Sequence, residues 1–436
     1  MEINIPVSDL PRVVVVGGGF GGIELIKRLK NKAFQLVLID KNNYHTFQPL
    51  LYQVATAGLE PDSIAFPLRK IFKRQKNFYF RMAEVQRIEA DKQLVVTSIG
   101  DLHYDYLVLA TGSTSNFFGN TKFETASMGM KSIVEALNIR SLILQNFEKA
   151  LLISDPQQKE TLMSISIVGG GATGVEMAGA LSELKRHILP CDYPELDLRL
   201  MHIHIIEAGP RLIAGMSEEA SKATYDFLQK MGVKVWLNTR VQDFNGETLT
   251  TQNGDTISSK TMFWAAGVAG NGVEGIPAAV ITRDKRILVN EFSQVKDLVN
   301  VFAIGDIAAM ITEKRPKGHP MLAPVAVQQG KVLAENLIRK QNNQDLKPFK
   351  YTDKGTMATV GRNHAVADIK SFKTQGLLAW FLWMFIHLWL LVGFRNKLVV
   401  MINWIWNYIN YDTGIRLIIR PYYKNAVTPA SHVETQ

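Results

Sequence analysis

The chain has 436 residues, too many for one compact core, so two or three domains are expected. Its apolar share of 47% and charged share of 20% exclude a disordered chain. The net charge of +9 would suit nucleic acid, an anionic membrane surface or acidic ligands, but without a nucleic-acid-binding motif no nucleic-acid partner is expected. Cys191 is the single cysteine, which excludes enzymes that work through a redox pair of cysteines within one chain.

The first predicted elements form a strand, a glycine-rich turn and a helix. Arg12–Val16 is a β-branched run typical of a buried parallel strand. The turn GGGFGG follows at residues 17–22, and a helix is expected to continue to about Leu29. The next apolar run, QLVLID, predicts a second strand that ends at Asp40.

The same order of elements returns in the middle of the chain. A strand is expected at Ser164–Val168, before the turn GGGATG at residues 169–174 and a helix to about His187. The run MHIHIIE predicts a strand ending at Glu207, and an Asn-Gly pair at residues 253–254 predicts a hairpin turn. ATG ends at Gly112, 95 positions after Gly17, and AAG ends at Gly267, 98 positions after Gly169. Two copies of one nucleotide-binding unit explain these spacings.

Both turns fit the G-x-G-x-x-G pattern of a dinucleotide-binding loop. Glycine lets the backbone approach a diphosphate, and the following helix presents free N–H groups with its positive dipole end. The matching residues are Gly17, Gly19 and Gly22 in the first copy and Gly169, Gly171 and Gly174 in the second. Two such sites on one chain indicate a bound flavin together with a diffusing nicotinamide, with FAD expected at the N-terminal site.

An acidic residue ends the second strand of each copy. Asp40 lies 18 positions after Gly22 and is expected to accept hydrogen bonds from a ribose hydroxyl. Glu207 lies 33 positions after Gly174, beyond the usual spacing of about 20, with an apparent insertion between. A carboxylate there would repel the 2′-phosphate of NADP, which favours NADH, although Arg211 nearby could accommodate that phosphate.

The elements after the second copy are expected to contribute to the N-terminal nucleotide site. VFAIGDIA, residues 301–308, places Asp306 at a strand–helix junction, where it would bond the ribityl hydroxyls of a flavin or simply cap a helix. A helix is expected at about Ala326–Arg339, followed by a hairpin at Gly355–Ile369. The remaining chain is rich in tryptophan.

Several stretches resemble the type II NADH dehydrogenases, which are single-subunit NADH:quinone oxidoreductases. The two glycine turns and the segments ATG, AAG and AIGD are shared with the wider group of flavoproteins that bind two dinucleotides. NYHTFQPLLYQVATAGLEP at residues 43–61 and GRNHAVADI at residues 361–369 are more specific. The resemblance implies an α/β fold with two Rossmann-like domains, the NAD domain inserted in the FAD domain, and a membrane-associated helical region. It also implies a homodimer.

The resemblance further implies roles for individual residues. FAD contacts are expected at Thr111, Gly112 and Asp306, and an NADH contact at Gly267. Glu176 matches a glutamate near the nicotinamide and flavin rings, although a carboxylate in a first helical turn is also favoured by the helix dipole. In APVAVQQG, residues 323–330, Gln328 matches the second family glutamine of the quinone site and Gln329 follows it, while Pro324 stands where the first would be. Gln328 and Gln329 are therefore the expected quinone contacts.

The expected domains follow from these assignments. Residues 8–120 and 289–350 form the FAD domain, residues 121–288 the NADH domain, and residues 351–436 the hairpin and membrane-associated region. The predicted activity passes two electrons from NADH through FAD to a membrane quinone. Two alternatives remain. One is a soluble NADH-dependent reductase for an iron–sulfur protein, and the other is an NADH-binding flavoprotein with slow catalytic turnover and a signalling role.

The tail from Gly376 to Gly393 is apolar except for His387. Its 18 residues fall short of the roughly 20 that a spanning helix needs, so helices in the plane of the cytoplasmic leaflet are expected. Asn403, Asn407 and Asn410 recur on one face of the next stretch, away from its isoleucines. A transmembrane helix and a dimer interface are the alternatives.

Overall fold

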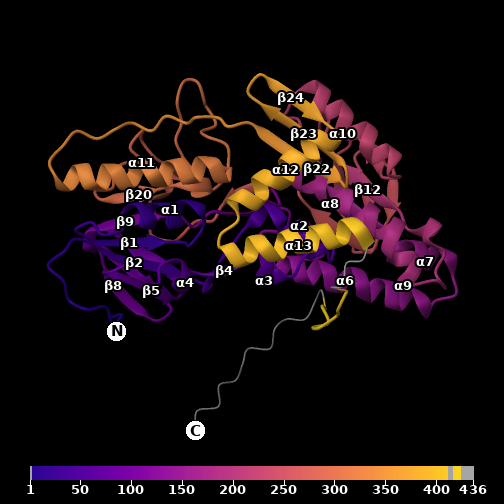
Figure 1. Ribbon diagram of the computed structural model, residues 1–436, viewed down its shortest axis with the longest axis horizontal. Coiled ribbons are helices and arrows are strands. Elements are labelled where there is room, and N and C mark those ends of the chain that lie inside the picture. Colours follow the sequence, from indigo (N-terminus) through magenta and orange to yellow (C-terminus); the bar gives the residue numbers. More distant parts are fainter. Residues whose placement is uncertain (1, 411–415, 424–436) are drawn as a thin grey trace, which may run out of the picture. The chain divides into compact units, whose positions relative to one another are not determined.

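The computed structural model describes residues 2–410 and 416–423 (Figure 1). Its contacts divide the chain into two units, each made of three segments. Unit 1 comprises Met1–Thr46, Ala65–Asn116 and Val268–Lys354. Unit 2 comprises Phe47–Ile64, Phe117–Gly267 and Gly355–Gln436.

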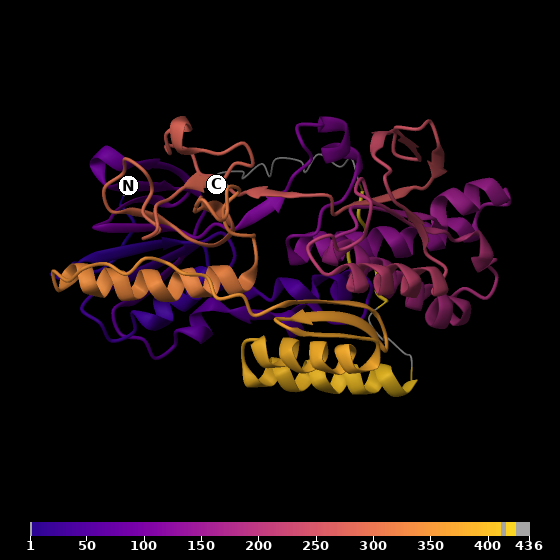
Figure 2. The same cartoon turned by 90° about the horizontal axis from the view of Figure 1, so that it is seen from above.

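Unit 1 is built on a five-stranded parallel sheet in the order β20-β9-β1-β2-β5. The strands are β1 (Arg12–Val16), β2 (Gln35–Asp40), β5 (Phe78–Met82), β9 (Tyr106–Leu109) and β20 (Val301–Ala303). Their β-branched and aliphatic side chains are buried on both faces, as a parallel sheet covered by helices requires. Helices α1 (Phe20–Arg28) and α11 (Ala323–Gln341) pack together in this unit, where Gly330 faces the backbone of Gly21 (Figures 1 and 2).

Unit 2 repeats this plan with the parallel order β13-β12-β11-β17. Its strands are β11 (Ile165–Val168), β12 (Ile203–Ile206), β13 (Lys234–Trp236) and β17 (Thr261–Trp264), and its helices are α6 (Ile133–Leu151), α8 (Ala172–Glu183) and α10 (Glu218–Lys230). The order matches β5-β2-β1-β9, strand for strand. The predicted duplication is therefore confirmed.

Each copy also carries a three-stranded antiparallel sheet before its last parallel strand. In unit 1 it consists of β6 (Val85–Glu89), β7 (Leu94–Thr97) and β8 (Gly100–His103). In unit 2 it consists of β14 (Val241–Phe244), β15 (Thr248–Thr251) and β16 (Thr256–Ser258). Gly254, with φ of +86°, lies in the turn between β15 and β16, which confirms the predicted Asn-Gly hairpin.

Shorter elements complete the two units. Those of unit 1 are β3 (Tyr44–Thr46), β4 (Ala65–Pro67), α4 (Leu68–Ile71), β10 (Ser113–Ser115), β18 (Val268–Gly270), β19 (Ile287–Leu288) and β21 (Ala308–Ala309). Those of unit 2 are α2 (Leu51–Ala55), α3 (Pro61–Ile64), α5 (Thr121–Ala126), α7 (Pro156–Met163) and α9 (Leu189–Asp192). Between α8 and α9 the chain forms one π-helical segment, Leu184–Ile188, so the helix predicted to reach His187 changes its hydrogen-bond pattern after Glu183.

The C-terminal part of unit 2 combines a small sheet with two helices. The predicted hairpin is present as β22 (Thr356–Gly361) and β23 (His364–Ile369), and a third strand that was not predicted, β24 (Phe372–Gln375), pairs with β23. Helices α12 (Leu377–Leu390) and α13 (Phe394–Asn410) lie side by side, and α12 packs on β23 (Figure 2). Among residues 2–410 and 416–423, no helix has the length and apolarity to cross a membrane.

Candidate active site

The first glycine loop joins β1 to α1 and leaves no room for side chains at two of its glycines. Gly17 has φ of +109°, and a Cβ there would lie 2.3 Å from the carbonyl oxygen of Ala110. A Cβ on Gly22 would lie 2.1 Å from the oxygen of Gly17. A Cβ on Gly19 would meet nothing within 4 Å in the described chain, so this glycine faces open space. The loop is fixed by close packing on one side and is accessible on the other.

The second loop, between β11 and α8, has the same geometry. Gly169 has φ of +113°, and its Cβ would lie 2.5 Å from the carbonyl carbon of Ala265. A Cβ on Gly174 would lie 2.0 Å from the oxygen of Gly169. Gly171, like Gly19, has no atom of the described chain within 4 Å of a Cβ. The two predicted fingerprints therefore form two equivalent cradles.

Both cradles fit the diphosphate of a dinucleotide. Gly19 and Gly171 are the N-caps of α1 and α8, and within the described residues no side chain caps either helix. The first-turn N–H groups and the positive end of the helix dipole thus face the open side of each loop. The open glycine, the free helix start and the tight turn are the features that bring a backbone close to phosphate oxygens.

The two acidic residues occupy equivalent positions. Asp40 accepts hydrogen bonds from the backbone N–H groups of Gly18 at 2.6 Å and Asn42 at 2.7 Å. Glu207 accepts from Gly170 at 2.6 Å and Gly209 at 2.7 Å. The insertion before β12 therefore leaves Glu207 next to its glycine loop.

The electrostatics at Asp40 combine burial with these backbone donors. Burial raises the pKa of Asp40, and the N–H groups of Asn42 and Gly18 partly offset that effect. A ribose hydroxyl would be a further donor to a carboxylate that is already held in place.

The other residues expected around FAD lie in unit 1. Thr111 donates to the carbonyl of Asn271 at 2.6 Å, and Gly112 has φ of +74°. Ser113 donates to the Asp306 carboxylate at 2.7 Å, in the turn that follows β20. Gly267, the residue expected near NADH, lies between β17 and β18 and is the last residue of its segment of unit 2.

The two glutamines predicted to contact quinone are engaged inside unit 1. Gln328 exchanges two hydrogen bonds with the backbone of Thr352, each at 2.9 Å. Gln329 is buried and accepts from the N–H of Gly305 at 2.7 Å. Pro324 lies in the first turn of α11, where a missing N–H costs no helical hydrogen bond. Gln329 thus holds the backbone next to Asp306, Gln328 holds the backbone at Thr352, and the contact of either with quinone stays a prediction.

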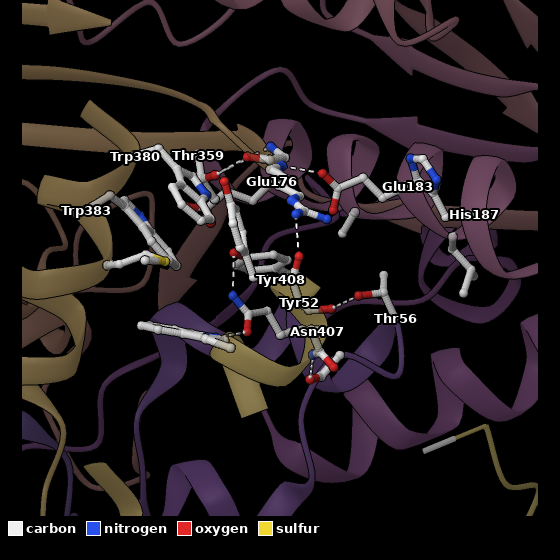
Figure 3. A pocket seen from close by; sticks show the side chains of 18 of the residues that line it. Tyr52, Thr56, Glu176, Glu183, His187, Thr359, Trp380, Trp383, Asn407 and Tyr408 are labelled. Atoms are coloured by element: carbon white, nitrogen blue, oxygen red, sulfur yellow. Dashed lines mark hydrogen bonds between the residues drawn. The ribbon is translucent and has the colours of Figure 1, made fainter. Parts of the chain in front are cut away.

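Unit 2 contains a cavity of about 160 Å³ that the sequence did not predict (Figure 3). Its walls come from α2, α8, the turn between β22 and β23, α12 and α13. Its aromatic lining consists of Tyr52, Trp380, Trp383, Trp404 and Tyr408, and its titratable lining includes Glu176, Glu183, His187 and Arg362.

Glu176 borders this cavity near Trp383 and Thr359 (Figure 3). The side chain is half-buried among the residues that line the cavity. Burial raises the pKa of Glu176 to about 8, and the nearby Thr359 backbone and Trp383 indole lower it only in part. Glu176 therefore holds a proton at neutral pH, which a simple helix-dipole residue exposed to water would not do.

Hydrogen bonds hold the walls of the cavity in place. The indole N–H of Trp404 donates to Gln53 at 2.9 Å, and the amide of Asn407 donates to the carbonyl of Gly58 at 3.3 Å. Asn396 is buried and donates to the carbonyl of Asp62 at 3.0 Å. The asparagines of α13 thus anchor this helix to the segment 47–64.

Sequence reasoning missed most of the cavity because its residues are far apart in the chain. Only Glu176 was identified as a site residue, and this came from the resemblance to the family. Glu183 lies seven positions later, a spacing that puts both carboxylates on one face of α8, and this was the available signal. Tyr52 and the tryptophans gave no such signal, since isolated aromatic residues are most often core residues.

Comparison with known proteins identifies the family. The pyridine nucleotide-disulphide oxidoreductase family model matches residues 11–330, and the NDH2 C-terminal domain matches residues 354–410. A type II NADH:quinone oxidoreductase of Mycobacterium tuberculosis, Ndh, is 34% identical and covers 92% of this chain and 89% of that protein. The Haemophilus influenzae enzyme of the same name is 32% identical, covering 83% and 87%.

Solved structures share the fold. NDH2 from Plasmodium falciparum, in complex with NADH, has a TM-score of 0.86 at 20% identity, covering 94% of this chain and 100% of that chain. The sulfide:quinone oxidoreductase from Aquifex aeolicus has a TM-score of 0.70 at 21% identity, covering 89% and 92%. At such identities the likeness concerns the fold alone. The family model and the 34% and 32% identical relatives show that the chain belongs to the type II NADH:quinone oxidoreductase family.

Proposed function

We propose that this protein oxidises NADH with the help of bound FAD and reduces a membrane quinone without pumping protons. The observation that carries the proposal is the pair of equivalent cradles in one chain, together with an aromatic cavity lined by the C-terminal helices. Bound flavin supplies the acceptance of hydride from NADH and the delivery of two electrons. The single cysteine fits this chemistry, since no cysteine pair is needed.

The cradle of unit 1 would hold FAD and the cradle of unit 2 would hold NADH. Backbone N–H groups at the two helix starts would bind the diphosphates, and the carboxylates of Asp40 and Glu207 would bind ribose hydroxyls. The negative charge of Glu207 favours NADH over NADPH. The proposed FAD contacts are Gly17, Gly19, Gly22, Asp40, Thr111, Gly112 and Asp306, and the proposed NADH contacts are Gly169, Gly171, Gly174, Glu207 and Gly267.

The cavity of unit 2 is the better candidate for the quinone headgroup than the glutamine pair. Trp380, Trp383 and Tyr408 offer aromatic surfaces for a flat ring, and Glu176 offers a carboxylic proton to a quinone oxygen. Gln328 and Gln329 would first have to release their present backbone partners. We keep them as secondary candidates.

The outer faces of α12 and α13 support attachment to a membrane surface. Phe385, Trp389 and Ile409 are 65%, 71% and 68% exposed, whereas Asn403 and Asn407 are half-buried towards the protein. Apolar residues with tryptophan among them favour the lipid interface, and a helix that turns its polar face inwards favours a partner other than water. We propose attachment to the cytoplasmic leaflet, with the protein acting as a homodimer.

The direct test is anaerobic stopped-flow spectroscopy on the purified protein. NADH should bleach the flavin absorbance, and a short-chain quinone should restore it at a rate that supports turnover. Denaturation should release about one FAD per chain. If NADH reduced the flavin but only an iron–sulfur protein reoxidised it, the protein would be a soluble reductase. If NADH reduced the flavin only slowly, the protein would be an NADH-binding flavoprotein with a signalling role. Either result would overturn the proposal.

A further inference from the structure

One wall of the cavity carries three titratable side chains in line. Glu176 and Glu183 lie on α8, and His187 lies on the π-helical segment that continues it. All three border the same cavity. Figure 3 shows Trp383 at one end, then Glu176, Glu183 and finally His187. At 1.5 Å per residue, the line from Glu176 to His187 extends about 16 Å.

The contacts around Glu183 fix its position. Its Oε1 accepts a hydrogen bond from the backbone N–H of Arg362, in the turn between β22 and β23. The guanidinium of Arg362 lies over the ring of Tyr408, 3.9 Å from its centroid, and donates to the Tyr408 carbonyl. A Cβ on Gly361 would lie 2.9 Å from the same carboxylate, so the turn closes tightly on Glu183.

The charged and titratable groups that face this line come from four elements. The turn between β22 and β23 supplies Arg362, α13 supplies Tyr408, α2 supplies Tyr52, and the π-helical segment supplies Arg186 beside His187. Burial raises the pKa of Glu183, which the Arg362 backbone and charge offset in part. Burial also lowers the pKa of His187, with Arg186 and Arg362 adding to the effect.

The residues of the line therefore have complementary proton-transfer properties. Carboxyl and imidazole groups both accept and release protons, so these three side chains are groups through which a proton can pass.

The proposed reaction needs one proton from water in each turnover. NADH gives a hydride, which contains two electrons and one proton, and becomes NAD⁺. A quinone that becomes a quinol gains two electrons and two protons. The balance is NADH + H⁺ + quinone → NAD⁺ + quinol. The site that binds the quinone must therefore receive a proton as well as the electrons.

We propose that Glu183 relays this proton from water at His187 through the cavity to Glu176, which donates it to the quinone oxygen. The inference rests on the proposed function and adds the route of the proton to it. Two helical turns, about 10 Å, separate Glu183 from Glu176, so water in the cavity must bridge them. A volume of about 160 Å³ has room for several waters at roughly 30 Å³ each.

The substitution Glu183→Gln tests whether residue 183 transfers a proton while it keeps the local structure. Glutamine has the same shape and can still accept the hydrogen bond from the Arg362 N–H, but it cannot carry a proton. Glu183→Asp keeps the acid and should retain most of the activity. Glu195→Gln is the matched control, because Glu195 is exposed and outside the cavity.

The experiment mixes NADH-reduced protein with a short-chain quinone in weak buffer and follows a pH indicator together with flavin absorbance. In Glu183→Gln, proton uptake and flavin reoxidation should slow at least about tenfold at pH 8, as expected on losing a proton-transfer group. Flavin reduction by NADH should stay within about twofold of wild type, since that half-reaction does not use the relay. Added imidazole or formate should restore part of the rate.

An independent readout does not depend on turnover. In an infrared pH titration of the protein, Glu183→Gln should remove one carboxyl C=O component, which Glu195→Gln should leave in place. His187→Gln is the second variant, and it replaces Glu183→Gln in the test if that variant does not fold. It should slow proton uptake in the same way. Unchanged proton uptake and an unchanged pH profile in both variants would overturn the relay. Wild-type protein that fails to reduce quinone would instead overturn the proposed function.

Discussion

At the scale of residues, two different acids perform the same local task. Asp40 is the last residue of β2, and Glu207 follows β12 directly, yet each carboxylate binds the N–H of the middle glycine of its loop. Each also binds the N–H of the residue two positions further along the chain. The carboxylate thus stabilises the turn and stays beside the groove where a ribose would lie. This double task explains why an acid suits both positions.

Glu176 leads to a prediction about stability and pH. Its pKa is about 8 in the folded protein and 4.5 in the unfolded chain, so the folded state binds the extra proton between these values. The resulting stability is present below pH 4.5 and is lost as pH rises through 8. One pKa unit corresponds to about 1.4 kcal/mol, and because the half-buried carboxyl borders an open cavity we discount the full effect to on the order of 2 kcal/mol.

Glu176→Gln should remove this dependence. The free energy of unfolding, measured in urea between pH 5 and pH 8.5, should fall less with pH in the variant than in the wild type. Glu195→Gln, at an exposed position, should follow the wild-type curve. Parallel curves for wild type and Glu176→Gln would show that the Glu176 carboxyl is not kept protonated by burial.

At the scale of elements, α13 reverses the usual arrangement of an amphipathic helix. Its asparagines Asn396 and Asn407 bond to carbonyls of the segment 47–64, while Ile402 and Ile409 are exposed. The sequence predicted that Asn403, Asn407 and Asn410 would share a face; Asn403 and Asn407 are half-buried, whereas Asn410 is exposed like the isoleucines. The sequence could not show which face meets the protein, since that depends on carbonyl groups more than 300 positions away in the chain.

Replacing the exposed isoleucines should weaken attachment to membranes. Ile402→Gln and Ile409→Gln each remove a side chain whose transfer from water contributes about 1.5–3 kcal/mol when fully buried, so the double variant should bind vesicles at least about tenfold more weakly. Sedimentation with vesicles that contain anionic lipid measures this change. Val134→Gln, on an exposed position of α6, should bind like wild type. Equal binding of all three proteins would exclude the outer face of α13 as the contact surface.

The elements differ in how well the sequence predicts them. The glycine loops were predicted because strand, turn and helix are neighbours in the chain and their spacing contains the signal. Strand β24 was missed because its polar sequence FKTQ lacks an apolar alternation and pairs only with β23. The cavity was missed because α2, α8 and α12 bring together residues from positions 52 to 408. Such a site depends on packing between distant segments, which no local pattern records.

At the scale of the whole molecule, one chain contains two cradles with the same backbone geometry, and we propose a different nucleotide for each. Gly19 and Gly171 allow the two cradles to be tested one at a time, because a Cβ on either glycine meets nothing within 4 Å in the described chain. Their φ values of −78° and −72° are also accessible to alanine. An added methyl group at either position should therefore meet the bound nucleotide and leave the fold undisturbed.

Gly19→Ala should lower the amount of FAD that copurifies while leaving NADH binding unchanged. Gly171→Ala should keep FAD but raise the Kd for NADH at least about tenfold, a loss of about 1.4 kcal/mol or more. Flavin absorbance per chain and calorimetric titration with NADH measure the two effects, and each variant serves as the control for the other. Because FAD stabilises the folded state that binds it, only Gly19→Ala should also lower the thermal midpoint, and added FAD should restore it. If each variant weakened both nucleotides equally, the two cradles would not bind their nucleotides independently, and the assignment of one ligand to each copy would be wrong.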